Sequence, residues 1–232
     1  MDTINLYMCL RNNDKTLKFT FDILETLEQC LHNTKFNYFF YENDSIDNTR
    51  QLIKTFMLNR NGNFTFENCN NKQYSSISSL ERTQYMAKIR NKMKSLSCGF
   101  HSDYSLLLDT DIEFTYKDIE TMLSTLKNNK SIAMVIPFGY AKNKLYKYYD
   151  TYALLTMDDK NHLQSFGLPS IIEVKSGFGG IAILLSDIFD ECKWDFNQKI
   201  LKSEHLSLCR DVRCLGKIAL LTYVKVGWNT FK

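Results

Sequence analysis

The stretch YSLLLDTDIEF, Tyr104 to Phe114, places two carboxylates directly after a short apolar run. Side chains alternate along an extended backbone, so Asp109 and Asp111 can face one site while Thr110 points away. Two carboxylates this close repel each other, and a divalent cation such as Mg²⁺ or Mn²⁺ relieves that repulsion and can then bridge phosphate oxygens. The stretch therefore indicates a buried strand that ends in a metal site or, equally well when taken alone, in a solvated acidic turn.

Short apolar segments alternate with amphipathic helical segments on the N-terminal side of this motif. We expect strands at Asn5–Leu10, Phe36–Tyr41, Asn63–Glu67 and Tyr104–Leu108, and helices at Thr16–Leu31, Thr49–Leu58 and Leu80–Leu96. This order predicts an α/β fold with a mostly parallel central sheet flanked by helices. Ligands of such sheets bind beyond the carboxyl ends of the strands, which is where Asp44 and Asp109 fall.

The second half of the chain contains fewer regular patterns. We expect helices at Asp118–Leu126 and Glu204–Val212, and strands at Ile132–Pro137, Ile171–Val174, Gly180–Leu185 and Ile218–Val226. The polar and aromatic segment Lys142–Pro169 fits none of these patterns, and we expect an active-site loop region there. A chain of 232 residues with 44% hydrophobic side chains can bury one large core, so we expect a single domain over residues 1–232.

Composition and charge exclude several classes of protein. The net charge of +3 is small and the basic residues are scattered, which argues against a duplex nucleic-acid binder. Seven cysteines without a CxxC pair predict neither a zinc site nor a disulfide framework, so we expect reduced thiols. No segment approaches the roughly 18 apolar residues of a transmembrane helix, and nothing resembles a signal peptide. These features predict a cytoplasmic protein without its own membrane anchor.

Polar groups at two further positions are candidates for ligand binding. Glu42 and Asp44 occupy alternate positions where the second strand ends, and such carboxylates can accept hydrogen bonds from a ribose hydroxyl or a base N–H. The alternative is an acidic turn that caps the next helix. Arg82 and Arg90 flank the apolar face of the third helix, where either can clamp a diphosphate or remain a solvated or salt-bridged residue.

Two motifs in the second half are ambiguous in the same way. The glycine-rich run SGFGG, Ser176 to Gly180, allows close backbone approach to a ligand, although a plain glycine turn is equally consistent with it. In Ser203-Glu204-His205, the serine suits a helix N-cap and the glutamate suits the first helical turn. Glu204 and His205 also provide a general base and a nitrogen ligand side by side.

Taken in order, the motifs resemble nucleotide-sugar glycosyltransferases with the A-type (GT-A) fold, over roughly residues 3–229. The similarity is to the capsule-associated mannosyltransferase-like group and to glycosyltransferases of large DNA viruses. It rests on Tyr41–Thr49 (YENDSIDNT), Arg90-Asn91, Asp109–Asp111, Phe178–Gly180 and Ser203–His205. The resemblance implies a nucleotide-binding half at about residues 1–115 and an acceptor-side half at about 116–232. It also suggests the cytoplasm of a host cell as the location if the chain is viral.

The resemblance implies roles for the candidate residues. The diphosphate of a UDP- or GDP-sugar would be held through Mn²⁺ or Mg²⁺ at Asp111, with Asp109 on the metal or the sugar side and His205 completing the metal shell. Glu42 and Asp44 would contact the nucleoside, while Arg82 or Arg90 would stabilise phosphate or sugar oxygens. The residues expected to bind the donor or the metal are therefore Glu42, Asp44, Arg82, Arg90, Asp109, Asp111 and His205.

The acceptor side follows from the same resemblance. If the transfer inverts the anomeric centre, Glu204 is the expected base for the acceptor hydroxyl, and a retaining transfer needs no such base. A glycan acceptor is expected near Asp150, within the aromatic and polar segment Tyr146–Tyr152, and near Phe178 and Gly179.

Two other classes of protein remain as alternatives. A phosphatase of the haloacid dehalogenase type also has a DxD motif after an apolar strand and uses the first Asp as a nucleophile. In proteins of that class the motif lies near the start of the fold, whereas three strand and helix units precede Asp109 here. The second alternative is a non-catalytic nucleotide- or glycan-binding module. The oligomeric state, the sugar and the stereochemistry are not predicted by the sequence.

Overall fold

The computed structural model of the chain describes residues 1–70, 79–141, 144–195 and 203–228. In these ranges the strands are β1 (Asp2–Leu10), β2 (Thr34–Asn43), β3 (Gly62–Glu67), β4 (Tyr104–Leu108), β5 (Ile112–Glu113), β6 (Ile132–Ala141), β7 (Lys144–Tyr148), β8 (Leu155–Thr156), β9 (Ile171–Ser176), β10 (Ile181–Leu185) and β11 (Lys217–Trp228). The helices are α1 (Asp14–Cys30), α2 (Thr49–Met57), α3 (Leu80–Ser95), α4 (Tyr116–Asn128), α5 (Ser186–Glu191) and α6 (Glu204–Leu215).

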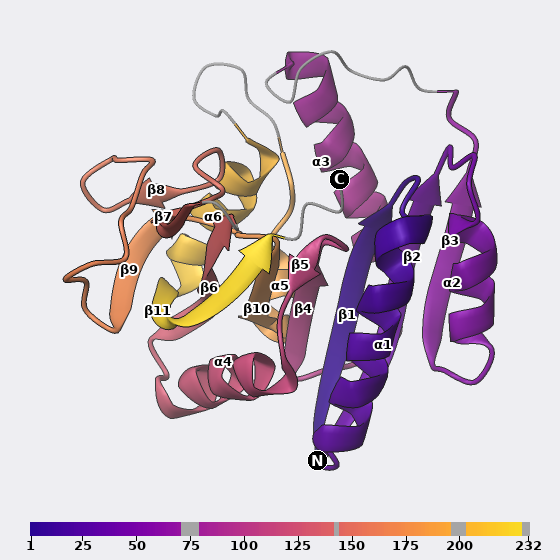
Figure 1. Cartoon of the computed structure of the whole chain (residues 1–232), viewed down its shortest axis with the longest axis horizontal. Coiled ribbons are helices and arrows are strands. Elements are labelled where there is room, and N and C mark those ends of the chain that lie inside the picture. Colours follow the sequence, from indigo (N-terminus) through magenta and orange to yellow (C-terminus); the bar gives the residue numbers. More distant parts are fainter. Residues whose placement is uncertain (71–78, 142–143, 196–202, 229–232) are drawn as a thin grey trace.

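All the strands belong to one mixed sheet with the order β3-β2-β1-β4-β10-β6-β11-β9-β8, while β5 pairs with β11 and β7 with β6 (Figure 1). The first four strands in this order are parallel, as expected from the alternating strands and helices. β10 is antiparallel to both of its neighbours, β4 and β6, and the next two strands, β6 and β11, are parallel to each other. The expected α/β fold with a largely parallel sheet is therefore confirmed.

Helices cover both faces of the sheet, and each face has its own apolar core. Alternate residues of β1 show the division, since Leu6 and Met8 pack with α1, α2 and α4, whereas Tyr7 packs with α3, α5 and α6. Core side chains are buried across the whole width of the sheet, from Phe40 in β2 to Leu220 in β11. The sheet is thus a rigid support for the loops that follow its strands.

Four short elements were not expected from the sequence, namely β5, β7, β8 and α5. The expected loop region Lys142–Pro169 contains β7 and β8, whose pairings lengthen the sheet beyond the α/β core. Its residues Lys142 and Asn143, like Lys202 beside the helix-start motif, lie outside the described residues. These strands are too short for a clear periodicity, and they depend on pairing with β6 and β9.

Serine residues cap two helices that face the site, and the Ser203 cap was expected from the sequence. The Ser203 hydroxyl accepts a hydrogen bond from the His205 backbone N–H at 3.3 Å, so α6 begins where the serine caps it. Ser79 caps α3 in the same way through the Arg82 N–H. These caps set the position of Glu204 and Arg82 along the two helices that face the site.

No helix in the described part of the chain is long and apolar enough to cross a lipid bilayer. All seven cysteines are free thiols, as expected.

Candidate active site

Asp109 and Asp111 follow the carboxyl end of β4, at the middle of the sheet. The Asp109 N–H donates to the Gly180 carbonyl at 2.8 Å, which ties this turn to the glycine-rich loop before β10. The intervening Thr110 points inward and is buried, where its hydroxyl accepts from the Asn13 side chain at 2.8 Å. The alternation expected from the sequence thus separates a structural threonine from two half-buried carboxylates.

The environment of this pair disfavours negative charge. Burial raises the pKa of Asp109 to about 7, with Arg90 opposing the rise and Asp111, Asp150 and Glu204 adding to it. Burial also raises the pKa of Asp111. No hydrogen bond from another residue in the described ranges reaches either carboxylate. A divalent cation would supply the missing positive charge, so the two oxygen ligands fit Mg²⁺ or Mn²⁺.

Arg90 and Glu204 form a buried ion pair between α3 and α6. The Arg90 Nε lies 3.1 Å from the Glu204 Oε1, and both side chains are almost fully buried. Burial would raise the pKa of Glu204, but protonated His205 and the Arg90 guanidinium oppose this rise, and the pKa lies below its usual value. Near neutral pH His205 is itself uncharged, because burial and then Arg90 lower its pKa to about 3, so the charge that keeps Glu204 ionised comes from Arg90.

His205 and Phe178 pack against each other beside the ion pair of Arg90 and Glu204. Their rings stack with centroids 4.2 Å apart, and the Arg90 guanidinium carbon lies 5.5 Å from the centre of the Phe178 ring. Phe178 is only 2% exposed, so the expected contact of its side chain with an acceptor does not fit this structure. Its ring instead holds His205 and Arg90 in place.

His205 is not part of a preformed metal shell in the described residues, where no group of three His, Cys, Asp or Glu side chains is arranged to hold an ion. Its Nε2 lies 3.6 Å from the Glu204 carboxylate. Neutral imidazole is a suitable metal ligand. However, the donor set that the structure presents together is the pair Asp109 and Asp111, and the remaining ligands of an ion would have to come from phosphate, from water or from a movement of His205.

Glu42 and Asp44 hold the turn after β2 together. Glu42 is completely buried, and its oxygens accept from the Ser45 N–H at 2.7 Å and from Arg50. The expected contact between Glu42 and a nucleoside does not fit, because both oxygens already have partners within the turn. Asp44 has a left-handed backbone with φ of 55° and accepts from the N–H groups of Cys69 and Asn70. Asp44 is half-buried and remains a candidate.

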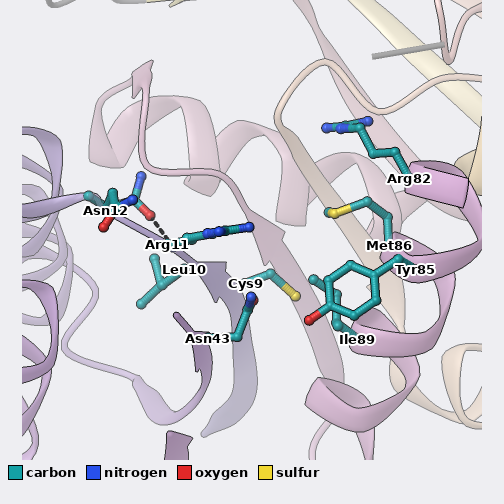
Figure 2. A pocket seen from close by; sticks show the side chains of 10 residues that line it. Cys9, Leu10, Arg11, Asn12, Asn43, Arg82, Tyr85, Met86 and Ile89 are labelled. Atoms are coloured by element: carbon teal, nitrogen blue, oxygen red, sulfur yellow. Dashed lines mark hydrogen bonds between the residues drawn. The ribbon is translucent and has the colours of Figure 1, made fainter. Parts of the chain in front are cut away.

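A cavity of about 440 Å³ lies beyond the carboxyl end of β1, between that strand and α3 (Figure 2). Arg11 reaches into it from the strand end and Arg82 from the helix, on the opposite wall. Cys9, which also lines it, lies within electrostatic range of Arg90, Asp109 and Glu204. The cavity is lined by Cys9, Leu10, Arg11, Asn12, Asn13, Asn43, Arg82, Tyr85, Met86 and Ile89.

Of the two arginines expected to contact phosphate, the structure brings Arg82 to the cavity and places Arg90 in the buried ion pair. Sequence reasoning missed the loop Arg11–Asn13, although the rule that ligands bind at strand carboxyl ends applies to β1 as much as to β2 and β4. Asn12 has φ of 52°, a conformation that asparagine tolerates better than most residues. The order of strands β2-β1-β4 places this loop next to Thr110.

Asp150 lies on the other side of the site, after β7. Its carboxylate accepts from the Ala153 N–H at 3.2 Å, and it lies within electrostatic range of both Asp109 and Glu204. Burial raises its pKa, while backbone N–H groups of Ala153 and Gly179 oppose the rise. Gly179 has φ of 64°, which brings its backbone close to the Tyr148 hydroxyl. Nothing is described for the side chain of Tyr146.

The largely parallel sheet flanked by helices, with its paired carboxylates at the end of a central strand, defines a GT-A glycosyltransferase fold, and solved structures agree. Staphylococcus aureus TarS 1–349 in complex with UDP-GlcNAc superposes with a TM-score of 0.61 at 11% identity, covering 100% of this chain and 59% of its own. Glucosyl-3-phosphoglycerate synthase from Mycobacterium tuberculosis, in complex with Mg²⁺ and UDP, gives 0.52 at 9% identity, covering 97% and 70%. The chain thus spans about 60% of the TarS 1–349 structure.

The sequence itself matches one family model over residues 4–211, that of the family described as Cryptococcal mannosyltransferase 1. The chain belongs to this glycosyltransferase family. No curated protein sequence matches it. Membership of this family displaces the phosphatase alternative, as does the position of the DxD motif after the fourth strand of the chain.

Proposed function

We propose that the protein transfers a sugar from a nucleoside-diphosphate donor, a UDP- or GDP-sugar, to a hydroxyl group of a glycan. The observation that supports this most directly is the cluster of Asp109, Asp111 and Arg90 beside a cavity entered by two arginines. The donor nucleoside occupies that cavity, near Asp44 and Arg82. Its diphosphate then extends toward Asp109 and Asp111 at the centre of the sheet.

Asp109 and Asp111 hold Mn²⁺ or Mg²⁺ in this proposal. When bound there, such an ion would supply positive charge for the departing nucleoside diphosphate. Ions of this kind are bound through one or two carboxylates together with substrate phosphates, which matches a pair without a third protein ligand among the described residues. Arg82 adds a guanidinium that can make two hydrogen bonds to phosphate oxygens. His205 approaches the ion only if its ring leaves Phe178.

Glu204 is our proposed base for an inverting transfer, because its lowered pKa keeps it ionised and able to accept a proton from the acceptor hydroxyl. It is at the same time bound to Arg90, so it can accept that proton only from an acceptor that reaches the buried pair. Asp150 and the backbone at Gly179 would bind the acceptor beside it. The free cysteines suit work in the cytoplasm.

The variant Asp111→Ala tests the metal site. We expect the wild type to release nucleoside diphosphate from one member of a panel of UDP- and GDP-sugars when Mn²⁺ or Mg²⁺ is present, and we expect Asp111→Ala to lose at least about 100-fold of that rate. The matched control is Asp22→Ala, which removes an exposed carboxylate on α1.

The same panel is measured by thermal shift, because a ligand that binds only the folded state raises the melting temperature. Metal-dependent stabilisation by a nucleotide sugar without any release of nucleoside diphosphate would indicate the non-catalytic binding module. Unchanged turnover in Asp111→Ala, with turnover by the wild type established, would overturn the metal assignment.

A further inference from the structure

Two aromatic side chains stack on each other next to the paired carboxylates. The rings of Tyr149 and Trp228 have centroids 4.5 Å apart and planes inclined by 37°. Tyr149 is 45% exposed although it is a large aromatic residue, and Trp228 is half-buried. An exposed aromatic pair costs hydrophobic free energy unless a ligand covers it, so its position in the molecule is informative.

Backbone pairing places Trp228 beside the DxD motif. It is the last residue of β11 and lies opposite Ile112 of β5, the residue that directly follows Asp111 (Figure 1). A Cβ atom on Gly180 would lie 3.1 Å from the indole, and the Gly180 carbonyl accepts the Asp109 N–H. The indole therefore lies against the backbone at Gly180, which binds Asp109, and Trp228 lies opposite Ile112, which follows Asp111.

Tyr149 is held beside the same site from another part of the chain. Its backbone N–H donates to the Gly139 carbonyl of β6 at 2.8 Å, and the next residue along the chain is Asp150. Both aromatic residues thus have a backbone neighbour in the proposed site, Asp111 through Ile112 for Trp228 and Asp150 for Tyr149. The pair lies on the side of the motif that is formed by the second half of the chain, whereas the β1 cavity is formed by the first half.

The polar atoms around the pair show what kind of ligand it suits. The Trp228 Nε1 atom is buried without a hydrogen-bond partner among the described residues, and a Cβ on Gly139 would lie 3.1 Å from it. The indole N–H is thus turned inward, so the pair presents ring surface, and Asp150 is the next residue along the chain from Tyr149. Ring faces suit the C–H groups of a pyranose, and a carboxylate accepts hydrogen bonds from its hydroxyls.

We propose that Tyr149 and Trp228 form a stacking platform for a pyranose ring of the acceptor glycan, beside the metal and diphosphate site. This proposal rests on the proposed transferase function for the role of the bound sugar as acceptor. The ring plane of the acceptor lies on Tyr149 and the exposed part of Trp228, and its hydroxyls face Asp150.

Tryptophan fluorescence tests the platform directly, since the chain has two tryptophans and the other, Trp194, is buried in the core. The probes are methyl α-D-mannopyranoside, methyl β-D-glucopyranoside, methyl β-D-galactopyranoside and N-acetylglucosamine, each titrated up to its solubility limit. We expect a saturable change in emission with at least one of them. The variant Trp228→Phe should abolish that change, because Trp194 is remote from solvent.

A second variant, Tyr149→Ala, tests the platform even if Trp228→Phe fails to fold. Tyr149→Ala should weaken the apparent sugar affinity by roughly 3- to 10-fold, the range for loss of one aromatic contact. Tyr223→Ala removes an aromatic side chain of similar exposure, 50%, from the middle of β11, where its hydroxyl contacts Thr125 of α4. This variant should leave the affinity unchanged. No saturable response in the wild type, or a response retained in both Trp228→Phe and Tyr149→Ala, would overturn the platform.

Donor turnover, measured in parallel, separates this proposal from the proposed function. Platform variants that keep metal-dependent release of nucleoside diphosphate but lose the sugar response support both proposals. A sugar response that depends on Tyr149 in a protein without any donor turnover would retain the platform as a glycan-binding site and reject the transferase function.

Discussion

The buried ion pair between Arg90 and Glu204 shows how strongly single residues are constrained in this site. Each charge has lost most of its contact with water, and each is stabilised by the other at 3.1 Å. Removing one member leaves an uncompensated charge in the protein, which costs far more than the pair contributes as a whole. Arg90, which was expected to contact phosphate, therefore binds Glu204 instead and joins α3 to α6.

We predict that Arg90→Met and Glu204→Leu each lower the free energy of unfolding by about 3–5 kcal/mol, and that the double variant recovers much of this loss. The measurement is urea unfolding of the two single variants and the double variant. Arg210→Met, which breaks an exposed pair with Asp211, is the matched control and should cost less than about 1 kcal/mol. Additive losses in the double variant would show that the two side chains are not energetically coupled.

At the scale of elements, Glu67 joins β3, β2 and α3 in the first half of the chain. As the last residue of β3, it accepts hydrogen bonds from Lys92 of α3 at 2.5 and 2.7 Å and from the Tyr41 hydroxyl of β2 at 2.7 Å. The hydrogen bond from Lys92, followed by that from Tyr41, lowers the pKa of Glu67. Helix α3, which carries Arg82, is thus bound to the edge of the sheet through the Glu67 carboxylate. The charge of this carboxylate depends on pH.

A carboxyl whose pKa is lowered by folding stabilises the folded state above its unfolded pKa of about 4.3, and this contribution disappears as the pH falls through the folded value. We therefore predict that Glu67→Gln lowers the melting temperature near neutral pH and has little effect at the acidic end of the profile. Melting curves of both proteins between neutral and acidic pH test this. Glu120→Gln, an exposed change on α4, should follow the wild-type profile, and a constant difference between Glu67→Gln and wild type at every pH would contradict the assignment.

At the scale of the whole molecule, the two halves share one sheet. β10 lies between β4 of the first half and β6 of the second and pairs with both, and each of the two apolar cores contains residues from both halves. Neither half could separate without exposing the edge of a buried strand and part of each core. We infer a single cooperative domain over the chain.

The corresponding prediction concerns unfolding. Peptides from β1 and β11 should lose protection from hydrogen exchange together, at the same urea concentration, because a single domain unfolds in one transition. Exchange followed by mass spectrometry across a urea series measures this. If β11 lost protection at a clearly lower urea concentration than β1, the second half of the chain would be a separate folding unit.

Local sequence patterns alone determined much of the secondary structure of this protein. The strand before Asp109, the alternation that separates Thr110 from its neighbours, and the caps Ser79 and Ser203 follow from side-chain periodicity and from backbone N–H groups that need partners. These depend on residues a few positions apart, which is why the α/β order and most boundaries were predictable. The same patterns, with the order of the motifs, indicated the family.

Tertiary structure alone decided which of these residues meet, because contacts between segments a hundred residues apart leave no local periodicity. The pairing of Arg90 with Glu204, the burial of Phe178 under His205, and the enclosure of Glu42 within its own turn all depend on how distant elements pack. The position of Trp228 opposite Ile112, the residue after Asp111, depends on the register of two strands. The sequence thus indicated where the chemistry lies, and packing assigned which side chains can reach a ligand.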